Sequence, residues 1–108
     1  MTVTSMNWVF LSLASVFEVA FTTTFRFSDN FKNLLATAGF LACLFLSLFF
    51  LQLAIRSIPL GTAYAIWTGI GAIGTVVIGM AWFGEPVTAI RLLLIIGVVA
   101  AVIGLKFA

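Results

Sequence analysis

Four long apolar stretches alternate with short polar breaks along the chain. The stretches cover, in order, about residues 7–25, 33–55, 60–83 and 88–105. Each is close to the roughly 20 residues that a helix needs to cross the hydrocarbon core of a membrane. The pattern therefore predicts an all-α membrane protein, in which residues 1–108 form a single domain of four transmembrane helices.

The breaks contain residues that end helices. Asp29 and Asn30 lie in the first break, and both residue types favour turns. Pro59 disfavours helix at the residue before it and suits the first turn of the helix that follows. The run from Gly84 to Pro86 gives the third helix a stop and a turn. We therefore expect tight connections and no linker.

The composition agrees with a chain that is surrounded by lipid. Hydrophobic residues make up 64% of the chain and charged residues 7%, and the mean hydropathy is +1.32. A soluble domain needs far more polar surface to cover its core. Cys43 is the single cysteine and histidine is absent, so we expect no disulfide, metal site or cofactor. The five cations are spread over separate turns and ends, which is not the basic stripe of a nucleic-acid binder.

Lysine and arginine are almost evenly divided between the two sides of the predicted helices. Arg26, Lys32 and Arg91 fall on the side of the turns after the first and third helices. Arg56 and Lys106 fall on the opposite side. Because such residues near helix ends resist translocation, this near balance gives little orientation signal. Either a subtler feature fixes one topology, or the protein inserts both ways.

Glu18 is the one acid within the apolar stretches. It lies about 11 residues into the first helix, roughly 16 Å along the axis and close to the bilayer midplane. An ionised acid there is costly, so such residues are rare and usually functional. Loss of water favours the protonated carboxyl and a bound cation favours the charged one, so the group can exchange a proton for a cation. The structural alternative is a protonated carboxyl that only bonds a neighbouring helix.

Hydroxyl and aromatic side chains are spaced to line a site around this acid. The candidates for proton and substrate binding are Glu18, Tyr64, Trp67 and Ser47, and the candidates for lining the site are Ser15, Phe21 and Thr22. The lining residues share the helical face of the acid, while the two aromatics share a face of the third helix. An aromatic face can contact a cation, and a phenol or indole can hydrogen-bond the acid. Ordinary packing or an interfacial position is the alternative for the aromatics, and interhelical bonding is the alternative for the serine.

Small residues mark two further features. Gly69, Gly71 and Gly74 make the third helix a place where bending is easy, and we expect a hinge there. In the fourth helix the small residues Gly97, Ala101 and Gly104 suggest a face for a second subunit. Tight packing within one chain is the alternative. Four thin helices can hardly enclose a water-accessible cavity, so we expect at least a dimer.

Several motifs resemble the small multidrug resistance family of bacterial transporters, and together they span essentially the whole chain. They are Phe17-Glu18-Val19, Phe27-Ser28 with Phe31, the run from Ile58 to Ala72, Gly84-Glu85-Pro86 and Gly104-Leu105-Lys106. The stretch from Gly61 to Gly74 is specific, and it occurs together with the mid-membrane glutamate. The resemblance implies an antiparallel, dual-topology homodimer in the bacterial inner membrane that exchanges protons for a cation.

The same resemblance implies roles for individual residues. Glu18 matches the proton and substrate acid of the family, and one copy from each subunit would meet in a shared central site. Ser47 matches a hydroxyl near this acid, and Tyr64 and Trp67 match the aromatics that line the site.

Within the family, the guanidinium exporter branch is the most similar. The Thr-Gly-Ile-Gly run that follows Trp67 and the Gly-Leu-Lys ending resemble that branch. Phe21 stands where a tryptophan is usual, and Ser15 stands where a glycine is usual. The polar network around the substrate therefore differs from that of the branch at these two positions.

We therefore expect a proton-coupled antiporter that exports guanidinium or a substituted guanidinium, with Glu18 binding proton and substrate in turn. Quaternary ammonium ions are the alternative substrates. A second hypothesis is a non-transporting partner subunit of a heterodimeric transporter, and a third is a passive cation pore. No second acid, histidine or nucleophile pair accompanies Glu18, so we do not expect an enzyme.

Overall fold

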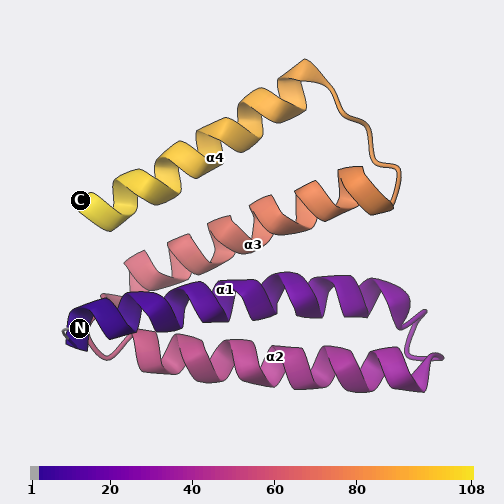
Figure 1. The fold of residues 1–108 in the computed structure, drawn as a ribbon, viewed down its shortest axis with the longest axis horizontal. Helices are drawn as coiled ribbons and strands as arrows, with labels where there is room; N and C mark the ends of the chain where they lie inside the picture. Colours follow the sequence, from indigo (N-terminus) through magenta and orange to yellow (C-terminus); the bar gives the residue numbers. More distant parts are fainter. Residues whose placement is uncertain (1–2) are drawn as a thin grey trace.

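The computed structural model describes residues 3–108, which fold into four helices joined by short connections (Figure 1). The helices are α1 (Val3–Phe27), α2 (Leu34–Ala54), α3 (Leu60–Trp82) and α4 (Ala89–Phe107). Each is long and apolar enough to cross a membrane. The prediction of an all-helical chain with four candidate transmembrane helices is confirmed.

Helix α1 is longer at both ends than the sequence pattern predicts. Its last turns contain Thr22, Thr23 and Thr24, whose hydroxyls donate to carbonyl groups three or four residues earlier in the same helix. The hydroxyls thereby satisfy their own hydrogen bonding without leaving the helix. The guanidinium of Arg26, in the last turn, lies over the Phe83 ring at 5.1 Å from the ring centroid, a cation–π contact. The other helix boundaries lie within two residues of the expected ones.

The connection between α1 and α2 is formed by a turn and a helix cap, and the turn lies where the sequence predicts it. Asp29, Asn30 and Phe31 have φ values of 48°, 56° and 67°, and the first two are residue types that tolerate this left-handed region. The side chain of Asn33 accepts a hydrogen bond from Ala36 N at 3.2 Å and caps the start of α2. The α1–α2 connection is therefore tight, and it brings α2 back alongside α1.

Helix α1 lies between α2 and α3, and α4 packs mainly along α3 (Figure 1). Helices α1 and α3 run in the same direction, so the connections after both lie at one end of the bundle, at the right in Figure 1. Phenylalanine rings fill the contact between α1 and α2, with Phe50 stacked on Phe10 and on Phe17 at centroid distances of 6.1 and 5.8 Å. Stacked aromatic pairs of this kind add to the packing energy of the interface.

Most of the apolar surface faces outward. No residue of α4 is buried within the chain, and the small core combines Leu11 of α1 with Ala54, Ile58, Ala63 and Ile66. In water such a surface would be unstable, whereas lipid tails are as apolar as leucine and solvate it. The arrangement is that of a protein surrounded by lipid or by further copies of itself.

The glycines of α3 are the points where its neighbours approach closely. A Cβ atom at Gly69 would overlap Val102 of α4, and one at Gly74 would overlap Val19 of α1. Helix α3 runs without interruption through both positions. The expected hinge at Gly69, Gly71 and Gly74 stays a prediction, but close packing already accounts for these small residues.

We expect Gly74→Ala to destabilise the protein by about 1–3 kcal/mol, because the added methyl group forces the β-branched side chain of Val19 out of its place. Gly61→Ala is the matched control, since a Cβ atom at Gly61 meets nothing within 4 Å. Thermal unfolding of both variants in the same detergent measures the difference. Equal stability of the two variants would contradict the packing described here.

Candidate functional site

The carboxyl group of Glu18 projects from α1 onto the backbone of α3 at Gly71. A Cβ atom at residue 71 would overlap this carboxyl, so only glycine lets the two helices meet here. The Oε2 atom is buried and has no hydrogen-bond partner within the part of the chain that the structure describes. A buried polar atom without a partner is energetically costly and calls for an explanation. Glu18 is therefore an acid with an uncommitted oxygen in the middle of a membrane-spanning helix.

A hydrogen-bonded link between three helices lies one turn away from this acid. The Ser47 hydroxyl on α2 donates to the carbonyl oxygen of Ala14 on α1 at 2.6 Å. It accepts a hydrogen bond from the indole Nε1 of Trp67 on α3 at 3.0 Å. Ser47 is fully buried, so both bonds are shielded from solvent. The structure thus uses this hydroxyl to hold Trp67 and α1 in place, with no hydrogen bond to Glu18.

Tyr64 lies beside Trp67 on the outer side of α3. The two ring centroids are 5.9 Å apart and the rings are tilted by 50°. More than half of the Tyr64 side chain is exposed in the single chain. The pair presents an aromatic surface whose inner member is fixed by Ser47 and whose outer member is open.

The three expected lining residues of α1 lie in different surroundings. The Ser15 hydroxyl is buried and donates to the Leu11 carbonyl at 2.9 Å, within its own helix. The Phe21 ring meets Phe40 of α2 edge-on, with centroids 6.1 Å apart. Thr22 contacts α3, where its hydroxyl lies 2.8 Å from that of Thr75 and the two form a hydrogen bond. The structure thus brings one further polar residue, Thr75, to the same side as Glu18.

The site residues predicted from the sequence do not include Thr75. The signal that could have identified it is spacing, since Thr75 follows Gly71 by four residues as Thr22 follows Glu18. In two parallel helices, positions with the same offset form successive contacts. The contact between Thr22 and Thr75 could be located from this spacing only if the contact between Glu18 and Gly71 were already known, and only the structure shows that contact.

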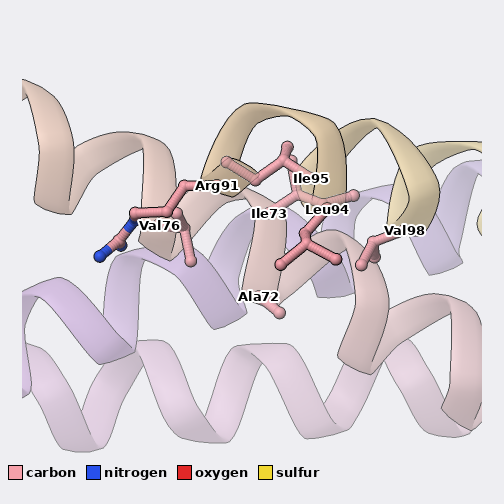
Figure 2. A pocket seen from close by; sticks show the side chains of 7 residues that line it. All are labelled: Ala72, Ile73, Val76, Arg91, Leu94, Ile95 and Val98. Carbon is pink, nitrogen blue, oxygen red and sulfur yellow. The ribbon is translucent and has the colours of Figure 1, made fainter. Parts of the chain in front are cut away.

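A separate apolar cavity of about 250 Å³ lies between α3 and α4 (Figure 2). It is lined by Ala72, Ile73, Val76, Arg91, Leu94, Ile95 and Val98. Figure 2 shows the aliphatic side chains gathered together and the Arg91 guanidinium pointing away from them. That guanidinium forms an ion pair with Glu85 at 3.2 Å. Because its one charged lining residue is cationic, this cavity is poorly suited to a cation, and Glu18 remains the acid of the candidate site.

We expect Ser47→Ala to lower the stability of the protein by about 1–3 kcal/mol, because the Ala14 carbonyl and the Trp67 indole would both lose their partner. Ser12→Ala is the control, since the Ser12 hydroxyl is exposed and donates only to the Trp8 carbonyl of its own helix. Thermal unfolding in detergent compares the two. A Ser47→Ala variant as stable as Ser12→Ala would show that the link contributes nothing.

Comparison with known proteins agrees with the residues and the fold. The family model described as Small Multidrug Resistance protein matches residues 6–107. A guanidinium exporter of Yersinia pseudotuberculosis is 39% identical over 103 residues, which cover 95% of this chain and 99% of the relative. A guanidinium exporter of Proteus vulgaris is 37% identical over the same length and coverage. One of Citrobacter freundii is 38% identical over 101 residues, covering 94% of this chain and 96% of the relative. The chain therefore belongs to the small multidrug resistance family of bacterial membrane transporters, which are not enzymes.

Proposed function

We propose that the protein exports small organic cations, guanidinium or a substituted guanidinium first, in exchange for protons. The observation that carries the proposal is the Glu18 carboxyl, which belongs to a membrane-spanning helix and has one buried oxygen, Oε2, without a partner. Its relatives that bear the name guanidinium exporter support the choice of cation.

The exchange follows from the electrostatics of a single carboxyl in a medium of low dielectric constant. A charged carboxylate there is stabilised by a cation, and without a cation it is stabilised by taking up a proton. Guanidinium is planar and donates parallel N–H bonds, which match the two oxygens of a carboxylate. Proton and cation therefore compete for Glu18, and a site that faces the two sides of the membrane in turn couples proton influx to cation export.

Trp67 and Tyr64 support the same role. Their rings lie 5.9 Å apart on α3 and offer aromatic faces to a planar cation. Trp67 is held by the buried Ser47 hydroxyl, so one wall of the site is rigid before the cation arrives. A wall that is already in place reduces the entropy lost on binding.

The transporting unit that we propose is an antiparallel homodimer of dual topology. Helix α4 has no buried residue, and Cβ atoms at Gly97 and Gly104 would meet nothing within 4 Å. These two glycines and Ala101 leave a surface that a second helix could approach closely. The near balance of lysine and arginine between the two sides favours insertion in both orientations. The two Glu18 carboxyls of such a dimer would titrate as a coupled pair.

We expect Glu18→Gln to reduce cation-driven proton movement in proteoliposomes to background, because an amide can neither bind a proton nor attract a cation. Asp29→Asn is the control, since Asp29 lies in the α1–α2 turn and asparagine tolerates its φ of 48°. The measurement is the current evoked by guanidinium across membranes of reconstituted protein. Current that persists in the Glu18→Gln variant would overturn the mechanism.

The same assay separates the possible substrates when guanidinium, a phenyl- or alkyl-guanidinium and a tetra-alkylammonium ion are presented in parallel. A response to guanidinium ions alone supports the guanidinium exporter role, despite Phe21 and Ser15. A response to tetra-alkylammonium would point to quaternary ammonium export. Purified protein that transports none of them would favour a partner subunit, and current without a proton gradient or fixed exchange ratio would favour a pore.

We expect Gly97→Leu to shift the protein from dimer to monomer, because a large side chain would hold a second helix away from this face. Gly61→Leu is the matched control, since its surroundings within the chain are equally open but it lies at the start of α3. Light scattering of the detergent-solubilised variants measures the mass of each. A Gly97→Leu variant that remains dimeric would place the subunit contact elsewhere.

A further inference from the structure

The contact between Glu18 and Gly71 continues toward one end of the bundle as a second polar contact. One turn further along α1 and α3, the hydroxyls of Thr22 and Thr75 are hydrogen-bonded at 2.8 Å. One α-helical turn corresponds to a rise of roughly 5–6 Å, which is a distance that one water molecule can bridge with two hydrogen bonds. The threonine pair is thus the next polar group after Glu18 along this seam.

The hydrogen bonding of the pair has a definite direction. Thr22 Oγ1 donates its one hydrogen to the Val19 carbonyl at 2.9 Å. The Thr75 hydroxyl is therefore the donor in the bond between the two threonines, and its oxygen keeps free lone pairs. These lone pairs can accept a hydrogen bond from a water molecule or from a protonated carboxyl.

Beyond the pair is a cavity of about 220 Å³ between α1, α3 and the segment that follows α3. Thr22 and Thr75 line it together with two charged residues, Arg26 in the last turn of α1 and Glu85 in the connection that follows α3. Glu85 contacts α3 so closely that a Cβ atom at Gly79 would overlap its carboxyl. A cavity of this volume with polar groups in its walls is large enough to hold several water molecules.

The residues that line the cavity differ between its two ends, with hydroxyl groups at the end near Glu18 and charged groups at the other. The hydroxyl pair belongs to the turns of α1 and α3 that follow Glu18 and Gly71. Arg26 is in the last turn of α1 and Glu85 follows α3, at the end of the bundle that carries both connections (Figure 1). Charged side chains near helix ends mark the boundary between hydrocarbon and water. The cavity therefore extends from the aqueous boundary toward the buried acid.

We propose that the Thr22–Thr75 pair and this cavity form a hydrated route for the proton between Glu18 and the water at the connection end. The proposal deepens the proposed function and rests on it. When Glu18 releases its proton, the O–H bond of the carboxyl breaks and the proton passes to a water molecule held by the threonine hydroxyls. It then leaves through the cavity to bulk water, and loading of the acid follows the same path in reverse.

Although Thr22 is a candidate for lining the site, the route lies beyond Gly71 from Tyr64 and Trp67, the residues proposed to contact the cation. Tyr64, Trp67 and Ser47 precede Gly71 in α3 or pack on the first half of α1, whereas Thr75 follows Gly71. Removal of the hydroxyls should therefore affect how fast the proton moves more than how tightly the cation binds. A loss of transport rate without a loss of cation affinity would therefore distinguish a proton route from a threonine pair that only stabilises the fold.

The test compares a Thr22→Val/Thr75→Val double variant with wild-type protein, since valine keeps the shape of threonine and removes the hydroxyl. Thr75→Ser tests rescue by a second hydroxyl. Thr37→Val is the control, because Thr37 lies on α2 and its hydroxyl donates only to the carbonyl of Asn33, the N-cap of that helix. Guanidinium affinity is measured by calorimetry in detergent, at a pH high enough that the affinity of wild-type protein no longer rises with pH. The rate of proton-driven guanidinium transport is measured in proteoliposomes.

We expect the double valine variant to transport at least about tenfold more slowly than wild type, as for the loss of a proton-transfer group, while its guanidinium affinity stays close to wild type. Thr75→Ser and Thr37→Val should transport at rates close to wild type. Wild-type rates in the double valine variant would overturn the route. A parallel loss of affinity and rate that Thr75→Ser does not rescue would also overturn it, and would make the pair a packing contact. Wild-type protein that moves no protons would overturn the proposed function as well.

Discussion

The close approach of the Glu18 carboxyl to the backbone of α3 at Gly71 determines how the first and third helices pack. At this contact the Glu18 carboxyl fits between the two helices because Gly71 has no side chain, and a Cβ atom there would overlap it. Gly74 does the same for Val19, and Thr22 meets Thr75 along the same seam. The parallel register of α1 and α3 therefore follows from the position of one acid and the glycines opposite it.

Hydrogen bonding within the bundle is consistent with this constraint. In lipid every polar group needs a partner inside the protein, and the hydroxyls of Ser15, Ser47, Thr22 and Thr75 all have one. Glu18 Oε2 is the exception among the buried side-chain atoms of the described residues. In our proposal a proton and a cation bind to this carboxyl alternately, which explains why Oε2 has no partner within the chain.

The fourth helix leaves most of its surface uncovered within the single chain. It packs mainly on α3, where Gly69 meets Val102, and none of its residues is buried. Because lipid solvates apolar side chains, helix association in a membrane depends on close packing of small residues rather than on the hydrophobic effect. The open glycines of α4 are suited to such packing, which is the physical basis of the homodimer that we propose.

Several properties of this protein could be predicted from the sequence. The lengths of the apolar stretches were sufficient for the four helices, because the thickness of a bilayer fixes the length of a spanning segment. The turn at Asp29 and Asn30 could be predicted because these residue types tolerate positive φ. The importance of Glu18 could be inferred because an acid in hydrocarbon is costly wherever the neighbouring helices lie. The family was recognisable from the motifs around it, and the comparisons confirm it.

Partners of side chains were decided only by the tertiary structure. The sequence placed Ser47 near the acid, but its hydroxyl holds Ala14 and Trp67 instead. It also gave no reason to connect Thr22 with Thr75, or the α3 glycines with Glu18, Val19 and Val102. A helical period specifies which residues share a face, whereas the rotation and axial shift of one helix against another depend on how all the side chains between them fit. That fit exists only in the folded chain, which is why the seam beside Glu18 could not be predicted from the sequence.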